Sequence, residues 1–376
     1  MRVHLLQKMT LPAVAIMISF SALAQLANMP RNPSPAAEVS QTVGISKITI
    51  NYSRPHVTAP NGQDRSGAIW GQQVPYGLSD PIPGFGSSNK FPWRAGANEN
   101  TVITFTDDVK IGGKDLAAGS YGLFLLVEEN GSATWILSKN TQSWGSFFYD
   151  EKEDALRVTV QSEENEQTPR LTYNFIDVTG NSATVALDWE KKRFPMKVEF
   201  DVHSIVVASM ANELRSTAGF TWQSYNQAAN YCLNNNVSLE QGLKWAETSI
   251  ANTSSFTNMS TKSQLLGKLG REAEAKAIIT AALEDPSATE IDYYNYGRQL
   301  IGQDKDQEAM AIFEKLNKKW PDHWLAPHGL ARGYSALGDY KKALKYERVA
   351  LEKAPSGSKV FLEGFVKTLE EGKDFN

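Results

Sequence analysis

The chain has 376 residues, an apolar content of 41%, 38 basic and 42 acidic side chains, and a formal net charge of −4. This composition is that of an ordinary globular protein, which argues against disorder and against a surface that attracts nucleic acid or anionic lipid. Cys232 is the single cysteine, so no intramolecular disulfide can form and stability must come from core burial. The length favours two domains.

A secretory signal peptide is predicted over residues 1–24. Arg2 and Lys8 flank the start, residues 9–20 form a short apolar run, and small residues lead up to Ala24. The run is shorter than the roughly 20 residues that span a bilayer, so cleavage after Ala24 is favoured over a membrane anchor. We therefore predict export to the periplasm or out of the cell. Cleavage would leave 36 basic and 42 acidic side chains, a net charge of −6.

Residues 25–36 are predicted to be an extended lead-in, and residues 37–202 an antiparallel β-sandwich-like domain. Asn130-Gly131 supplies the positive φ angles of a type I′ turn, and Gly112-Gly113 marks a second hairpin. Short strands separated by turns favour antiparallel sheets over parallel sheets with crossover helices. The predicted strands cover residues 45–52, 101–105, 109–111, 120–127, 133–138, 156–161, 170–176, 183–188 and 196–202.

One segment of this domain, residues 59–94, does not follow the strand pattern. It is rich in glycine and proline, which break regular structure, and a loop of this length inside a compact domain is uncommon. Its aromatic side chains argue against disorder. They are Trp70, Tyr76, Phe85, Phe91 and Trp93. We expect the segment to pack over the sheet.

Residues 203–218 are predicted to be a connecting helix, and residues 219–376 an all-α solenoid of tetratricopeptide (TPR) type. Ala275, Ala309 and Ala343 follow one another at intervals of 34 residues. A 34-residue period with small residues at helix crossings is typical of stacked helix–turn–helix repeats, which usually offer a groove to a protein or peptide partner. The predicted helices cover residues 222–233, 239–251, 262–269, 272–283, 292–301, 307–318, 324–337 and 340–353, with a capping helix at 361–369.

The sequence carries no common catalytic signature. It has no Gly-x-Ser-x-Gly elbow, no Walker loop and no His-Glu-x-x-His motif. His323 and His328 lack cysteine or acidic partners at metal-ligand spacing. We therefore predict no metal and no cofactor, and favour a non-catalytic protein over an enzyme.

Residues 93–101 form the densest polar cluster, and they support two interpretations. In the first they bind a small ligand: the planar fork of Arg94 suits a carboxylate or phosphate, and Asn98 and Glu99 can bond sugar hydroxyls or amides. In the second they are structural, with Arg94 and Glu99 as an ion pair and Asn98 bonded to the loop backbone. Further candidate ligand-binding residues are Arg54, Arg65, Tyr76, Trp93 and Trp144.

A family resemblance rests on an ordered series of motifs in the first half of the chain. These are residues 52–55, 65–71, 74–77, 93–101, 118–124, 144–145 and 149–150. The series resembles the DUF2911 family of exported Bacteroidetes proteins, a domain of unknown function often followed by TPR-like repeats. In many members Tyr-Gly nearly adjoins Trp-Arg, whereas here residues 78–92 intervene. The resemblance implies no known activity, catalytic residue or cofactor.

Two functions are therefore carried forward. The leading hypothesis is an exported binding or scaffolding protein whose repeats hold a protein or peptide partner. The alternative is an enzyme or receptor for a glycan or an anionic metabolite, with its site on the β domain around Arg94, Asn98 and Glu99.

Overall fold

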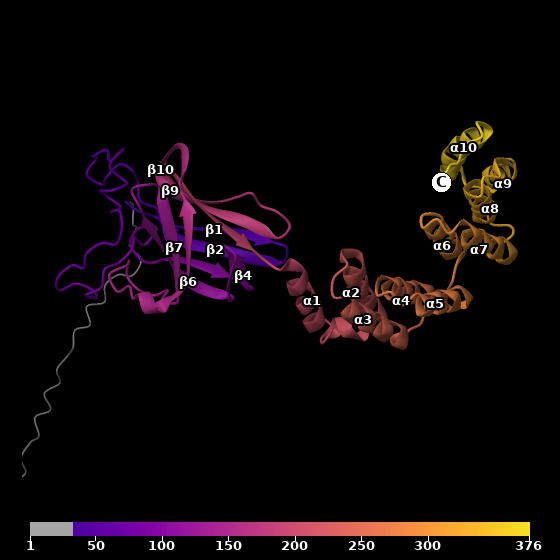
Figure 1. Cartoon of the computed structure of the whole chain (residues 1–376), viewed down its shortest axis with the longest axis horizontal. Helices are drawn as coiled ribbons and strands as arrows, with labels where there is room; N and C mark the ends of the chain where they lie inside the picture. The colour runs from indigo at the N-terminus through magenta and orange to yellow at the C-terminus, as the bar shows by residue number, and fades with distance from the viewer. Residues whose placement is uncertain (1–32) are drawn as a thin grey trace, which may run out of the picture. The chain divides into compact units, whose positions relative to one another are not determined.

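The computed structural model describes residues 33–376, so the predicted signal peptide and most of the predicted lead-in lie outside the described residues. The chain divides into two compact units, Met1–Phe200 and Asp201–Asn376 (Figure 1). Among the helices of the described part, none is both long and apolar enough to cross a membrane.

The first unit consists of two antiparallel sheets, as predicted (Figure 1). One sheet has the order β1-β2-β3-β6-β7-β8 and the other β5-β4-β10-β9. Burial alternates along β2 and β3, whereas most residues of β6 and β7 are buried on both faces. The Asn130-Gly131 segment joins β6 to β7 as predicted, but only Gly131 has a positive φ, of 85°, so the turn is not of type I′. The strands are β1 (Ala36–Val43), β2 (Ser46–Ser53), β3 (Thr101–Phe105), β4 (Val109–Ile111), β5 (Lys114–Leu116), β6 (Gly119–Val127), β7 (Ser132–Ser138), β8 (Asp154–Gln161), β9 (Glu163–Ile176) and β10 (Ser182–Glu199).

The last strand differs from the prediction, because the two strands expected at 183–188 and 196–202 are one strand, β10. Its polar middle had suggested a turn. Instead, the pairing of β10 with β9 shifts register on either side of Glu190, which takes a left-handed φ of 54°. The buried carboxylate of Asp188 accepts two hydrogen bonds from Arg193, at 2.7 and 2.8 Å, across this bulge. A bulge held by an ion pair thus replaces the predicted turn.

The glycine- and proline-rich segment packs against the sheet, as expected. Its Ile69 and Val74 side chains are 0% and 1% exposed. The Trp70 ring lies 5.0 Å from Phe194 and 5.9 Å from Trp189, both on β10. Aromatic contacts therefore fix a segment that has no regular strand or helix of its own.

The second unit contains the ten α-helices of the described residues and has the predicted TPR-like architecture (Figure 1). The small residues of the 34-residue slot, Ala275, Ala309 and Ala343, are all buried where helices cross. The helices are α1 (Val202–Glu213), α2 (Trp222–Asn235), α3 (Leu239–Asn252), α4 (Phe256–Lys268), α5 (Glu272–Glu284), α6 (Glu290–Ile301), α7 (Asp306–Lys319), α8 (Leu325–Ala336), α9 (Tyr340–Lys353) and α10 (Ser356–Glu370). Helix α1 ends earlier than the predicted connecting helix, and a 3-10 turn follows at Thr217–Phe220.

Glycines allow the close packing of α6, α7 and α8. The fully buried Phe313 ring on α7 fills the space left by Gly297 on α6 and by Gly329 and Gly333 on α8. A Cβ added at Gly297 would lie 2.3 to 2.9 Å from three ring atoms of Phe313. Such distances require the ring or the helices to move.

We expect Gly297→Ala to destabilise the helical unit. The strain, about 2–3 kcal/mol, should exceed the roughly 1 kcal/mol that alanine contributes to a helix. Gly364→Ala on α10 is the matched control, since a Cβ there meets nothing within 4 Å. Urea unfolding of the full chain, followed by far-UV circular dichroism, should show a loss for the first variant and a gain for the second. A gain for both would contradict this packing.

Candidate functional site

The helical stack opens between α5 and α6. Neighbouring helices α3 and α4 pack closely, as do α7 and α8, whereas α5 and α6 barely touch. The two sides stay joined at the base of the opening, where Ile279 and Leu283 of α5 share an apolar cluster with Tyr293 and Leu300 of α6. The hydroxyl of Tyr293 also donates to the Leu283 carbonyl. The opening is therefore a cleft with a fixed floor.

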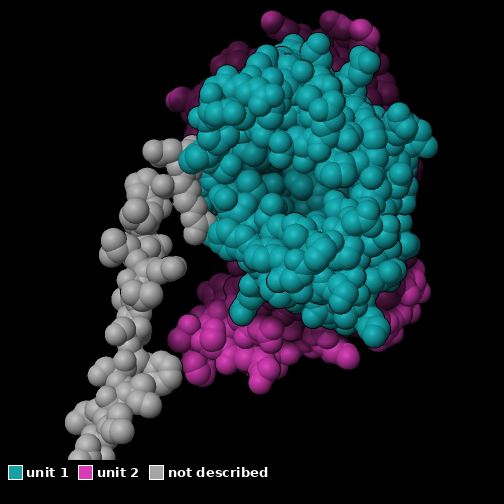
Figure 2. Space-filling model, turned by 90° about the vertical axis from the view of Figure 1, so that its left-hand side faces the viewer, with its two compact units in different colours: residues 1–200 teal, residues 201–376 magenta. Residues whose placement is uncertain are grey.

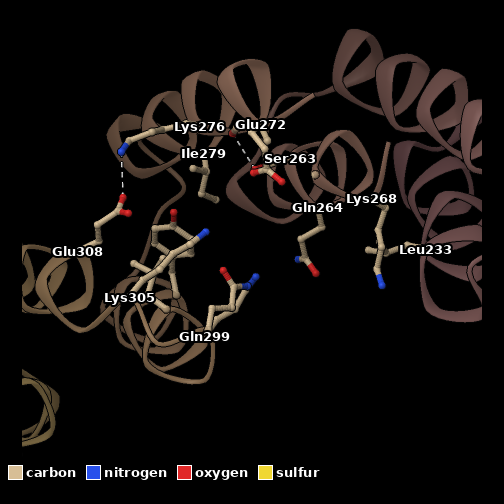
Figure 3. A pocket seen from close by; sticks show the side chains of 15 residues that line it. Leu233, Ser263, Gln264, Lys268, Glu272, Lys276, Ile279, Gln299, Lys305 and Glu308 are labelled. Carbon is tan, nitrogen blue, oxygen red and sulfur yellow. Dashed lines mark hydrogen bonds and ion pairs between the residues drawn. The ribbon is translucent and has the colours of Figure 1, made fainter. Parts of the chain in front are cut away.

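The cleft has a volume of about 450 Å³ and polar walls (Figure 3). Gln264 on α4 and Gln299 on α6 point into it from opposite sides, as Figure 3 shows. The exposed pair of Lys276 and Glu308, 2.9 Å apart, joins α5 to α7. The lining residues are Leu233, Ser263, Gln264, Gly267, Lys268, Glu272, Ala275, Lys276, Ile279, Tyr296, Gln299, Leu300, Gln303, Lys305 and Glu308.

Two lysines of the cleft hold no partner. Lys268 and Lys305 are exposed, and neither side chain makes an ion pair or hydrogen bond within residues 33–376. The amides of Gln299 and Gln303 are likewise uncommitted to other described side chains. The cleft thus offers donors and acceptors from the amides, two positive charges, and an apolar floor.

The prediction from sequence did not name these residues. Each is a polar side chain on an exposed helix face, and such residues usually contact only water. The repeat period could have pointed to one position of the cleft. Gln264, Arg298 and Arg332 follow one another at intervals of 34 residues, which places them in the same slot of α4, α6 and α8.

Three of the predicted β-domain residues, Arg65, Trp93 and Arg94, line one small cavity, and several of the candidates already make hydrogen bonds within the protein. Arg54 donates to the Leu171 carbonyl at 2.9 Å and to the Thr172 hydroxyl at 2.6 Å, so it joins the end of β2 to β9. Arg65 donates to the carbonyls of Val57 and His56 at 3.1 and 2.5 Å and to the side chain of Gln73 at 2.7 Å. Arg54 therefore links two strands, whereas Arg65 holds the backbone of a loop in place.

The Arg94 side chain is also engaged with the protein. It donates to the Asn98 carbonyl at 2.8 Å, lies 5.7 Å from the Phe147 ring centre, and leaves no room for a Cβ at Gly145. It makes no ion pair with any carboxylate of the described residues, and burial lowers its pKa. Asn98, at a left-handed φ of 60°, donates to the Ser34 carbonyl at 3.1 Å. Glu99 is partly buried beside it.

The remaining candidates are the aromatic residues Tyr76, Trp93 and Trp144. Trp144 is 48% exposed, and Tyr76 packs on Gly71. Trp93 stacks on Trp189 with ring centres 5.9 Å apart and donates to the Gly96 carbonyl at 3.1 Å.

A small cavity lies beside the stacked tryptophans. It measures about 250 Å³, and Arg65, Trp93, Arg94 and Trp189 are among its lining residues. The face of the first unit is hollowed near its middle, as Figure 2 shows. The indole N–H of Trp189 is buried and has no acceptor. Within the described residues, no group of three or more His, Cys, Asp or Glu side chains is arranged to hold a metal ion.

We expect Arg94→Ala to destabilise the first unit, because it removes a buried donor and the packing against Phe147. The expected loss in the free energy of unfolding is about 1–3 kcal/mol. Urea unfolding followed by tryptophan fluorescence would measure it. Lys191→Ala, at an exposed residue of β10, is the control and should change stability by less than about 0.5 kcal/mol. An unchanged midpoint for Arg94→Ala would instead favour a ligand-binding role for Arg94.

Comparison with known proteins agrees with this division of the chain. Residues 34–198 match the family model DUF2911, described as a protein of unknown function, and this match confirms the resemblance that the motifs predicted. A search of curated proteins returned no match.

Solved TPR proteins resemble part of the chain in fold. YrrB, a TPR protein with an unusual peptide-binding site, is 17% identical, with a TM-score of 0.30 over 44% of this chain and 84% of its own. The C-terminal part of a TPR repeat-containing protein from Cytophaga hutchinsonii is 16% identical, with a TM-score of 0.34 over 45% and 67%. PilW, a type IV pilus biogenesis factor, is 19% identical, with a TM-score of 0.32 over 46% and 80%.

Proposed function

We propose that this protein is an exported scaffolding protein whose helical unit binds an extended, acidic peptide segment of a partner protein. The segment lies in the cleft between α5 and α6. The observation that carries the proposal is the cleft itself, a fixed opening in the helical stack that contains unpaired lysines and uncommitted amides. Export rests on the sequence of residues 1–24, which has the three parts of a signal peptide.

The chemistry of the cleft matches an extended chain. A peptide backbone presents both N–H and C=O groups, and a glutamine amide supplies one partner for each. Gln264, whose amide nitrogen also donates to the Ser260 hydroxyl at 3.3 Å, and Gln299 stand on opposite walls, so a chain between them can be bonded from both sides. Ile279 and Leu300 form an apolar floor for a side chain that points inward.

The charges of the cleft favour acidic side chains on the partner. The charges of Lys276 and Glu308 cancel, because these two side chains are paired. The other charged lining residues are Lys268, Lys305 and Glu272, so the cleft has a net positive charge. Exposed lysines contribute little to affinity one by one, but they steer encounter and reject positively charged segments. The partner segment should therefore carry aspartate or glutamate near an apolar residue.

Selection from a random peptide display library on the full chain would test this proposal. We expect enriched peptides to be acidic, and to bind Lys268→Glu/Lys305→Glu at least tenfold more weakly, since both charges are reversed. Lys318→Glu/Lys345→Glu, which changes the same charge at two exposed residues outside the cleft, is the control and should keep binding. Equal loss in both variants, or no peptide enriched at all, would count against the cleft.

A second candidate function is favoured by one observation in the β domain. The Trp189 indole N–H is buried without an acceptor and its residue lines the 250 Å³ cavity. An unpaired buried donor costs stability, and a ligand that brings an acceptor removes that cost. The size of the cavity suits a small molecule with oxygen acceptors, such as a carboxylate or a monosaccharide.

A thermal-shift screen of small carboxylates and monosaccharides on the full chain would detect such a ligand. We expect a hit to raise the melting temperature of the wild type but not of Trp189→Phe, which keeps an aromatic ring and loses the N–H. Trp70→Phe is the matched control, because the Trp70 N–H is also unpaired and buried but the residue does not line the cavity. A shift retained in Trp189→Phe would exclude this role for the N–H.

A further inference from the structure

Residues 374–376 dock on α8 of their own chain. After α10 the backbone turns at Gly372, whose φ is 68°, and the segment Asp374-Phe375-Asn376 runs back onto α8. Each side chain of the segment makes its own contact with the helices, as described below.

Two residues of α8 make hydrogen bonds to the polar side chains of the segment. The Ser335 hydroxyl donates to the Asp374 carboxylate at 2.6 Å and accepts from the Phe375 backbone N–H at 3.4 Å. Arg332 donates from Nη1 to the side-chain oxygen of Asn376 at 3.1 Å, and the Asn376 amide donates back to the Arg332 carbonyl at 3.2 Å. One acidic and one amide side chain are thus recognised together.

The aromatic side chain of the segment enters a small aromatic cluster. The Phe375 ring centre lies 4.9 Å from Phe365 on α10 and 6.1 Å from His328 on α8. The Arg332 guanidinium stands 5.1 Å from the same ring centre. A stacked and a tilted ring contact, with a cation over the ring, favour an aromatic side chain over an aliphatic one.

The surface that receives the segment is held rigid from behind. Arg332 donates from Nε to the Tyr294 hydroxyl on α6 at 2.8 Å, and His328 Nδ1 lies 2.7 Å from the buried Glu347 carboxylate on α9. A side chain fixed by the protein loses little freedom when it binds, so the surface is prepared for a ligand.

The repeat relates this surface to the cleft. Arg332 occupies the slot that Gln264 occupies two repeats earlier, 68 residues before it, and Gln264 lines the cleft. Closure of the helical stack does not depend on the segment. Helix α10 already packs on α9 through the buried Leu362, and Asp374 and Asn376 stay exposed. The segment therefore occupies the ligand-facing side of a repeat, in the manner of a bound peptide.

The segment docks with its carboxylate ionised. Partial burial alone would raise the pKa of Asp374, but hydrogen bonds from Ser335, from Asn376 and from the Phe375 backbone outweigh it and lower the pKa. An anionic side chain is thus part of what the surface recognises.

We propose that the α8 surface formed by His328, Arg332, Ser335 and Phe365 is a second peptide-binding site, specific for an acidic–aromatic–amide segment. Residues 374–376 fill it in the free protein. The inference rests on the proposed peptide-binding function of the helical unit and assigns to it a separate site, a ligand pattern and an internal competitor. A partner segment of the same pattern binds when residues 374–376 are displaced.

A direct test uses a fluorescein-labelled, acetylated peptide of residues 371–376 and a full chain that lacks residues 374–376. We expect the shortened chain to bind the peptide in fluorescence anisotropy, and the intact chain to bind at least about tenfold more weakly, since a tethered competitor acts at about millimolar effective concentration. A peptide with alanine in place of Phe375 should not bind. No binding to the folded shortened chain at millimolar concentration, or equal binding of both peptides, would overturn the proposal.

Further variants keep the test decisive. If the shortened chain does not fold by circular dichroism, Phe375→Ala in the full chain frees the aromatic cluster instead and should bind the wild-type peptide. Ser335→Ala in the shortened chain should weaken binding at least about fivefold, because the peptide loses the hydrogen bonds that Asp374 and the Phe375 N–H make with this hydroxyl. Lys268→Glu/Lys305→Glu should leave binding of this peptide unchanged, so failure of the cleft and failure of the α8 site are separate outcomes.

Discussion

The helical unit depends on how closely successive helix pairs approach one another. A repeat cannot bury its apolar face alone, so each pair needs its neighbour. Successive pairs come together where a glycine faces a side chain of the neighbouring pair: Gly242 of α3 faces Leu265 of α4, and Gly329 of α8 faces Phe313 of α7. Helix α5 contains no glycine, and Gly267 of α4, which faces the cleft, meets nothing within 4 Å. Within α4 to α9, the cleft opens at the junction of α5 and α6, where this close approach is missing. The absence of close packing at this junction is therefore also what leaves space for the cleft.

In the β domain, residues 59–94 form a long segment that is not part of either sheet, so other contacts must hold it in place. Buried backbone carbonyls need donors, and Arg54, Arg65 and Arg94 supply them, each from a planar fork that reaches more than one acceptor or packs on a ring. Arg65 and Arg94 thus stabilise the loops at either end of residues 59–94, and the rings of Trp70 and Trp93 pack this segment against β10. The indole N–H groups of Trp189 and Trp70, whose ring centres are 5.9 Å apart, are exceptions to this pattern, because both are buried without an acceptor.

Patterns within one element were readable from the sequence, whereas relations between elements were less so. The 34-residue period gave the helices, and Asn130-Gly131 gave the β6–β7 hairpin, because a turn and a helix face are local properties. The polar middle of β10 was misread, since a bulge and a turn use the same residues and only the pairing with β9 distinguishes them. The candidate residues of the β domain were chosen for their chemistry, and chemistry alone does not show that a guanidinium is already occupied by backbone carbonyls. The cleft could not be predicted for a related reason. The 34-residue period is the same at a junction where helix pairs pack closely and at a junction where they separate.

The side chain at one position of the repeat differs between α4, α6 and α8 in what it contacts. In α4 this position holds the neutral amide of Gln264, in α6 Arg298, whose guanidinium lies 5.8 Å from the Tyr294 ring centre, and in α8 Arg332, which binds the chain's own Asn376. Because the backbone geometry of the slot is common, the side chain in it decides what is recognised. An amide suits a peptide backbone of any sequence, whereas a guanidinium fixed over aromatic rings selects an aromatic side chain with a polar neighbour. In the proposed function, the cleft therefore binds the backbone of a partner segment and the α8 surface selects its side chains, and this difference follows from the side chain at one repeated position.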